Sequence, residues 1–350
     1  MSYRTQDISN GWHFFSKNGL FKGETNLPTS NYLDLMRCGY IKDPFKGKNE
    51  SELFWVSEID WFYTKTFDID SETLNSERVY LCFDSVDTIA DIILNGEVIA
   101  SCDNTHKTYR IDVKHKLVNG ENRLKVYFYS PVEYIKEKLK KFPVPPNFNG
   151  VNGFTLIRKA AYQFGWDWGP CFPSSGFDKG VHLDIFSGAY IDNLRVEQQT
   201  SEEVADVSVV IETDTEAQTD VTASLYSPEG KFIASKAAEK IDTTQYRATF
   251  SVKNPELWWA NGQTDRTEQP LYRIDVTADD HARTVKIGLR EVRLLTAPDK
   301  EGADFCFAVN GKRIFAKGGN WIPADSFVAR VSRERYGQYV KNMQWANFNM

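Results

Sequence analysis

Short runs of alternating or β-branched residues, separated by turn residues, fill the first half of the chain. Asn95-Gly96 lies between two such apolar runs, which is the strongest short signal for a two-residue β-hairpin. Asn119-Gly120 marks a further turn. Many short strands at this spacing predict a mainly β domain, a sandwich or jelly roll, over residues 1–189. The predicted strands are at 60–69, 79–83, 90–94, 123–129 and 181–186.

One helix interrupts this domain, at 133–141. It carries four lysines, Lys136, Lys138, Lys140 and Lys141. A run of like charge on a helix is typical of a solvated face, so we expect no ligand there. A proline-containing loop follows, with Pro143, Pro145 and Pro146, and leads into an aromatic stretch. Long loops on rigid sandwiches often carry function.

The pattern changes in residues 190–293. Closely spaced strands predict an immunoglobulin-like sandwich, which lacks the usual disulfide because no cysteine falls within it. Trp258 and Trp259 are predicted to pack at a domain boundary rather than to contact a ligand. The predicted strands are at 204–213, 220–226, 231–236, 246–252, 271–278 and 283–290.

Residues 294–350 begin with a hairpin at 305–315, turning at Asn310-Gly311. Ser332 then precedes a helical pattern that runs to the end of the sequence. A strand, a loop and a helix form the first unit of a (β/α)8 TIM barrel. A complete barrel takes about 250 residues, so we predict a truncated barrel.

The candidate chemistry lies in Arg158–Pro173, whose centre is Gly165-Trp166-Asp167-Trp168-Gly169-Pro170. A carboxylate accepts hydrogen bonds from a pair of sugar hydroxyls, and an indole suits the apolar face of a sugar ring. In an extended chain the two indoles share one face and Asp167 takes the other. In a tight turn all three crowd one rim. The alternative is a tryptophan pair that fills a core, with Asp167 capping a turn.

This stretch, preceded by Arg158-Lys159, resembles the hallmark of the β-mannosidase branch of glycoside hydrolase family 2. Further strings typical of that family follow its order along nearly the whole chain. They are Asp43-Pro44-Phe45, Asn49-Glu50, Asp60-Trp61 with Tyr63, Leu94-Asn95-Gly96, and Lys317-Gly318-Gly319-Asn320-Trp321-Ile322-Pro323.

The resemblance implies a galactose-binding-like jelly roll, an immunoglobulin-like sandwich and the start of a catalytic barrel. It implies a retaining exo-β-mannosidase that removes terminal non-reducing mannose from β-mannosides such as mannan or glycan oligosaccharides. Asp167 would bind mannose hydroxyls, with Trp166 in the pocket wall and Trp168 beside it. Asn320 and Trp321 would lie at the mouth of the first barrel strand. Arg158 and Lys159 would orient Asp167 or lie on the surface, and for Lys159 we favour a structural role.

A retaining glycosidase needs two carboxyls about 5–5.5 Å apart, and Asp167 alone cannot supply both. The family's acid/base glutamate follows a Trp-Asn pair deep in the barrel, and no Trp-Asn-Glu occurs here. We therefore name no catalytic residue and expect the 350-residue chain to be inactive by itself. The alternatives are a carbohydrate-binding module without catalysis and a structural brace for a barrel. The sequence also departs from the family's Gly-Ile-Trp-Arg-Pro run, with Asp178-Lys179 in the Trp-Arg slots.

Net charge of −6 and a pI near 5.6 indicate no nucleic-acid or membrane partner. The longest apolar run is far below the ~18 residues of a membrane span. Five widely spaced cysteines and five scattered histidines predict neither disulfides nor a metal site. No nucleotide-binding motif is present, so no cofactor is expected. The first residues lack a signal peptide, which predicts a cytoplasmic protein, or a periplasmic or lysosome-like one if a signal was removed. The oligomeric state stays open.

Overall fold

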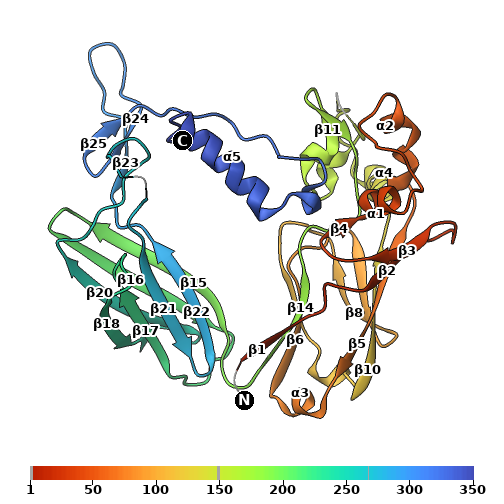
Figure 1. The fold of residues 1–350 in the computed structure, drawn as a ribbon, viewed down its shortest axis with the longest axis horizontal. Coiled ribbons are helices and arrows are strands. Elements are labelled where there is room, and N and C mark those ends of the chain that lie inside the picture. The colour runs from red at the N-terminus through yellow and green to blue at the C-terminus, as the bar shows by residue number, and fades with distance from the viewer. Residues whose placement is uncertain (1–2, 148–149, 267) are drawn as a thin grey trace. The chain divides into compact units, whose positions relative to one another are not determined.

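The computed structural model describes residues 3–147, 150–266 and 268–350 (Figure 1). The chain forms two compact units. One comprises Arg4–Ile185 with Ile322–Tyr336, and the other comprises Phe186–Trp321 and Gly337–Met350 with Tyr3.

The first unit is a sandwich of two antiparallel sheets. The six-stranded sheet has the order β3 (Lys22–Thr25), β2 (Trp12–Ser16), β5 (Trp61–Ile69), β10 (Gly120–Phe128), β7 (Ala90–Leu94) and β8 (Glu97–Cys102). The four-stranded sheet has the order β1 (Arg4–Asp7), β14 (Val181–Phe186), β6 (Arg78–Phe83) and β9 (Tyr109–Asp112). The predicted galactose-binding-like jelly roll is confirmed.

Side chains that alternate between buried and exposed positions along the strands build the core of this unit. In β10, Leu124, Val126 and Phe128 are buried while the residues between them are not, because successive side chains point to opposite faces. Phe177 lies at the centre, with its ring 5.2 Å from that of Phe128 and 5.4 Å from that of Tyr63. The predicted hairpin at Asn95-Gly96 joins β7 to β8, and both turn residues have positive φ.

Helices and short pairs fill the connections of the jelly roll. The predicted helix at 133–141 starts two residues earlier, because Pro131 suits the first helical position and Ser130 Oγ accepts from Glu133 N at 3.1 Å. The α-helices are α1 (Asn31–Arg37), α2 (Asn49–Glu52), α3 (Ser71–Asn75) and α4 (Pro131–Lys141). The 3-10 turns are η1 (Phe54–Ser57), η2 (Lys114–Lys116), η3 (Phe154–Leu156), η4 (Ala161–Gln163) and η5 (Val328–Arg330), and β4 (Thr29–Ser30) pairs with β13 (Gly176–Phe177).

The second unit contains the predicted immunoglobulin-like sandwich, which is confirmed. One sheet has the order β15 (Ile191–Thr200), β16 (Val204–Thr213), β20 (Gln245–Lys253) and β19 (Glu239–Lys240). The other has the order β18 (Phe232–Ala237), β17 (Val221–Tyr226), β21 (Tyr272–Ala278) and β22 (His281–Ile287). The inward side chains of β16 are aliphatic, as in Val207, Val209 and Ile211, and Tyr246 and Phe250 of β20 add aromatic rings to the core.

After this sandwich come β23 (Val292–Leu295), β24 (Cys306–Val309) and β25 (Lys312–Ile314), a small antiparallel sheet, and then α5 (Arg333–Trp345). The predicted hairpin turn at Asn310-Gly311 is confirmed by positive φ at both residues. Ser332 Oγ accepts from Arg335 N at 3.2 Å, so Ser332 caps α5 as predicted. The described residues form no closed barrel. The boundaries at 189 and 293, and the barrel start, stay predictions.

Candidate substrate-binding site

The motif Gly165–Pro170 forms the tip of a β-hairpin in the jelly-roll unit. β11 (Phe164–Trp166) pairs with β12 (Gly169–Cys171), and Trp166 lies opposite Gly169. Asp167 and Trp168 are therefore the two turn residues. Trp166 is 51% exposed and Trp168 45% exposed, and Asp167 is exposed between them. Of the two predicted arrangements the tight turn is correct, and the alternative of an indole pair filling a core is wrong for this hairpin.

Two buried phenylalanines hold the base of the hairpin. Phe164 packs with Ile135 of α4 and stacks on Phe154, with 5.5 Å between ring centroids. On the other strand, Phe172 is fully buried and stacks on Phe327 at 5.3 Å. Gly165 between these anchors has φ +85°, a region that side-chain-bearing residues disfavour. The base is thus packed while the tip stays in solvent.

The family-like strings near residue 45 support the same hairpin. Phe45 meets the ring of Phe172 edge-on at 5.3 Å. Glu50 Oε1 accepts a hydrogen bond from Cys171 N at 2.8 Å. Asn49 Nδ2 in turn donates to Asp43 O at 2.7 Å, which closes the loop that carries Phe45. These residues therefore act as supports of the hairpin.

A pocket of about 290 Å³ opens beside Trp168, near the lower limit for small-molecule sites. Two larger hollows of about 580 and 650 Å³ lie elsewhere in the unit, but neither is lined by a turn residue of the hairpin. Of these three hollows in the described part of the unit, the smaller pocket joins the candidate chemistry to a cavity. Its lining comprises Phe45, Tyr162, Trp168, Gly169, Pro170, residues 322–326 and Arg330.

The segment Ile322–Tyr336 supplies the opposite wall of this pocket. Phe327 anchors it, buried against Tyr32 at 5.4 Å and Phe172 at 5.3 Å between ring centroids. Asp325 accepts two hydrogen bonds from the Arg330 guanidinium, at 2.7 and 3.0 Å. Such a bidentate pair fixes both side chains in the wall.

Lys159 does not orient Asp167. Its side chain is fully buried, forms an ion pair with Asp87 and donates to Ser174 O at 2.6 Å. Gln163 Nε2 donates to the same Asp87 carboxylate at 3.1 Å. The expected structural role is correct, and the surface alternative is wrong for Lys159. Arg158 is exposed, and its carbonyl accepts from Thr105 N at 3.0 Å.

Asp178, the residue that departs from the family pattern, lies close to this buried pair. Burial and the negative charge of Asp87 raise the pKa of Asp178 to about 7, although the charge of Lys159 opposes the shift. Burial and the charge of Asp178 also raise the pKa of Tyr162, which lines the pocket. The charge of the Asp178 carboxylate therefore affects the pKa of Tyr162, a residue of the pocket wall.

Asn320 and Trp321 belong to the other compact unit and are exposed. Trp321 meets Tyr339 of α5 edge-on, at 5.6 Å between ring centroids. The roles predicted for Asn320 and Trp321 stay predictions, as do those of Trp166, Asp167 and Trp168.

Sequence reasoning missed five residues of the pocket wall: Tyr162, Ala324, Asp325, Ser326 and Arg330. Tyr162 stood inside the aromatic stretch and could have been named. The Asp325–Arg330 pair belongs to no sequence motif. It lines the pocket because the segment Ile322–Tyr336 folds back onto the jelly-roll unit.

Two family models match the chain. The model described as "Glycosyl hydrolase 2 galactose-binding domain-like" covers residues 12–179, and "Glycosyl hydrolases family 2" covers residues 189–290. The chain belongs to glycoside hydrolase family 2.

Several relatives of the chain within this family are named β-mannosidase. A beta-mannosidase B of Emericella nidulans is 32% identical, over 96% of this chain and 41% of the relative. One of Thermothelomyces thermophilus is 34% identical, over 91% and 38%. The crystal structure of a β-D-mannosidase from Dictyoglomus thermophilum superposes on the whole chain with a TM-score of 0.90 at 32% identity, covering 44% of that protein. The chain thus spans less than half the length of these relatives.

More distant structures share the fold. The exo-chitosanase of Amycolatopsis orientalis has a TM-score of 0.70 at 19% identity. Within the described residues, no helix has the length and apolar character needed to cross a membrane.

Proposed function

We propose that this chain supplies part of the substrate pocket of a retaining exo-β-mannosidase. That enzyme hydrolyses terminal non-reducing β-D-mannose residues in β-mannosides, including mannan or glycan oligosaccharides. The observation that carries the proposal is the exposed turn, in which one carboxylate stands between two indoles at the edge of a pocket. Similarity to β-mannosidases along nearly the whole chain supports the reaction class.

In this proposal Asp167 accepts hydrogen bonds from two mannose hydroxyls, and Trp166 and Trp168 lie against the apolar face of the ring. For Asn320 and Trp321 the proposed substrate contacts rest on the family resemblance alone. Binding at non-reacting hydroxyls lowers the barrier only where it strengthens in the transition state. Asp167 therefore supports bond cleavage without acting as acid or nucleophile, and the 350-residue chain alone does not hydrolyse mannosides.

The test is an assay on an aryl β-mannoside. The 350-residue chain is compared with the same protein continued through a complete barrel. We expect turnover only from the continued protein. Turnover by the 350-residue chain would refute the proposed division of labour.

A carbohydrate-binding role without catalysis is the second candidate, favoured by the two exposed indoles at the hairpin tip. Calorimetry of the 350-residue chain with mannose distinguishes a binding module from an incomplete enzyme pocket. An incomplete pocket should bind weakly, so affinity tighter than millimolar that is lost in Trp168→Ala would favour a binding module.

We also propose a cytoplasmic location. All five cysteines, Cys38, Cys82, Cys102, Cys171 and Cys306, are free thiols, which suits a reducing compartment. Quantitative thiol labelling tests the proposed location. The isolated protein is denatured without a reducing agent, and fewer than five reactive thiols would contradict a reducing compartment.

A further inference from the structure

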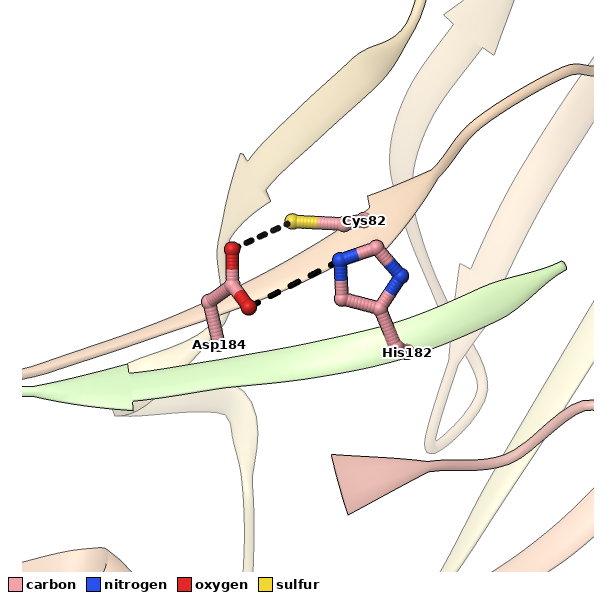
Figure 2. Close-up of side chains that lie close together, drawn as sticks. All are labelled: Cys82, His182 and Asp184. Atoms are coloured by element: carbon pink, nitrogen blue, oxygen red, sulfur yellow. Dashed lines mark hydrogen bonds and ion pairs between the residues drawn. The ribbon is translucent and has the colours of Figure 1, made fainter. Parts of the chain in front are cut away.

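A second cluster of reactive side chains lies on the four-stranded sheet of the jelly roll. On β14 the residues Val181, Leu183 and Ile185 belong to the apolar core. His182 and Asp184 alternate with them and so occupy the opposite face. Cys82 of the neighbouring strand β6 lies on that same face. Figure 2 shows the thiol, the imidazole and the carboxylate converging on one point.

The distances suit a single metal ion. Cys82 Sγ lies 3.6 Å from Asp184 Oδ2, and His182 Nε2 lies 3.6 Å from Asp184 Oδ1. All three ligand atoms lie within 4.8 Å of one another. Ligands on a tetrahedral zinc at ~2.0–2.3 Å stand roughly 3.3–3.7 Å apart. We propose that Cys82, His182 and Asp184 bind a zinc ion on this face of the jelly roll.

The chemistry of the set favours zinc. A thiolate with an imidazole and a carboxylate suits zinc, whereas magnesium and calcium prefer oxygen ligands alone. Asp84 Oδ2 lies 3.8 Å from the other ring nitrogen, Nδ1 of His182. A carboxylate beside the free ring nitrogen commonly orients a metal-bound imidazole.

The exposure of the residues leaves room for a fourth ligand. Cys82 and Asp184 are buried, but the His182 side chain is 24% exposed. Water therefore reaches the outer side of the cluster. Three protein ligands and one open position form a common zinc arrangement.

One existing contact must change when the metal binds, and a second can remain. The Cys82 thiol donates to Asp184, and burial raises the pKa of that thiol. Zinc replaces the thiol proton, which passes to solvent, because the thiolate is the ligand. Thr5 Oγ1 also donates to Asp184 Oδ1 at 3.1 Å, and this hydroxyl can remain as a support of the bound carboxylate.

The test uses cobalt(II) as a spectroscopic probe for zinc, added to the 350-residue chain under reducing conditions. We expect a thiolate-to-cobalt charge-transfer band that saturates at one equivalent and disappears when zinc is added. Cys82→Ser should abolish the band. His182→Gln and Asp184→Asn should weaken cobalt binding at least tenfold, and Asp84→Asn about 10–100-fold.

Cys102→Ser is the matched control, since Cys102 is also buried in the jelly roll but has no place in the cluster. It should keep the band. Because His182 is partly exposed, His182→Gln should fold, and zinc should raise the melting temperature of the unmodified chain but not of this variant.

Absence of the band in the unmodified chain would overturn the proposal. A band that survives Cys82→Ser and disappears in Cys38→Ser would also overturn it, because the metal would then bind at Cys38, an exposed thiol outside the cluster.

Discussion

The two β-sandwiches of this chain use the same kind of strand but connect their strands differently. In the immunoglobulin-like sandwich most connections are short, such as the one between β15 and β16, and the longest is residues 254–271 between β20 and β21. Its core is mainly aliphatic, with a few aromatic rings. In the jelly roll the chain leaves β10 at Phe128 and does not return to either of the two main sheets until β14 begins at Val181. That excursion contains α4 and the Trp166–Trp168 turn. A rigid sandwich can carry such a loop, and function concentrates there.

The excursion is held by polar groups as well as by apolar packing. Lys159, Asp87 and Gln163 form a buried network beneath the hairpin. The immunoglobulin-like sandwich is centred instead on aliphatic and aromatic side chains such as Val209 and Tyr246. A buried polar network is stable only when every partner is present. The two sandwiches should therefore respond differently to the loss of one side chain.

The largest effect is expected from Lys159→Met. This change leaves the Asp87 carboxylate buried without its cation, which typically costs about 3–5 kcal/mol. Urea unfolding of the jelly-roll unit measures the loss. Lys141→Met, at an exposed lysine at the end of α4, is the control and should stay within about 0.5 kcal/mol. If Lys159→Met and Lys141→Met lowered the free energy of unfolding equally, the buried polar network would not be what stabilises the excursion.

Trp258→Ala should come next and should affect the other sandwich. Trp258 N donates to Leu289 O at 2.9 Å, its carbonyl accepts from Asn310 Nδ2 at 2.9 Å, and Arg290 lies over its ring. A fully buried tryptophan costs about 3–5 kcal/mol on truncation, so this half-buried one should cost roughly 2 kcal/mol. Differential scanning calorimetry measures the change.

Turnover of the barrel-containing protein is the second readout for Trp258→Ala, and it should be retained. Phe232→Ala, on β18 and largely exposed, is the matched control for stability. An unchanged melting temperature together with lost turnover would reverse the structural assignment of Trp258.

Asp167→Ala should reduce kcat/KM of the barrel-containing protein about 10–100-fold, because a hydrogen bond to a charged group contributes ~1.5–3 kcal/mol. The melting temperature should not change, since the side chain is exposed at the turn. Asp167→Asn retains one acceptor oxygen and should recover part of the rate. An unchanged rate in Asp167→Ala would remove this residue from the site.

Asp178→Asn should have an effect that depends on pH and vanishes below pH ~4. Because burial raises the pKa of Asp178 to about 7 from 3.8, the folded state holds its proton more tightly than the unfolded state. The stabilisation is complete below pH ~4 and is lost as pH rises through ~7. The asparagine variant should therefore gain in melting temperature, relative to the native chain, between pH 5 and 8.

Asp60→Asn provides a control with the opposite sign. Burial opposes ionisation of Asp60, but hydrogen bonds from Lys17, Ser130 N and Tyr127 outweigh it and lower its pKa. Its stabilisation is present at neutral pH and is lost as pH falls through the lowered pKa. A parallel pH dependence of the two variants would contradict the difference in their surroundings.

Much of the fold was predictable because its signals are local. Alternation in β10 and the Asn-Gly turns depend on residues within a few positions of one another. The Trp166–Trp168 motif was also visible, but its shape was not. Whether the indoles share a face or crowd a rim depends on the turn, and that turn is set by the anchors Phe164 and Phe172.

The sequence by itself determined the strand pattern, the two sandwiches and the family to which the chain belongs. Tertiary structure decided which distant residues meet. Phe327 packs on Phe172 and so anchors the segment that lines the pocket beside Trp168. Cys82 meets His182 and Asp184. Both sets of contacts span sequence separations for which no local pattern exists. The physical reason is that strand pairing and core packing set such contacts, and these forces depend on the whole folded chain rather than on neighbouring residues.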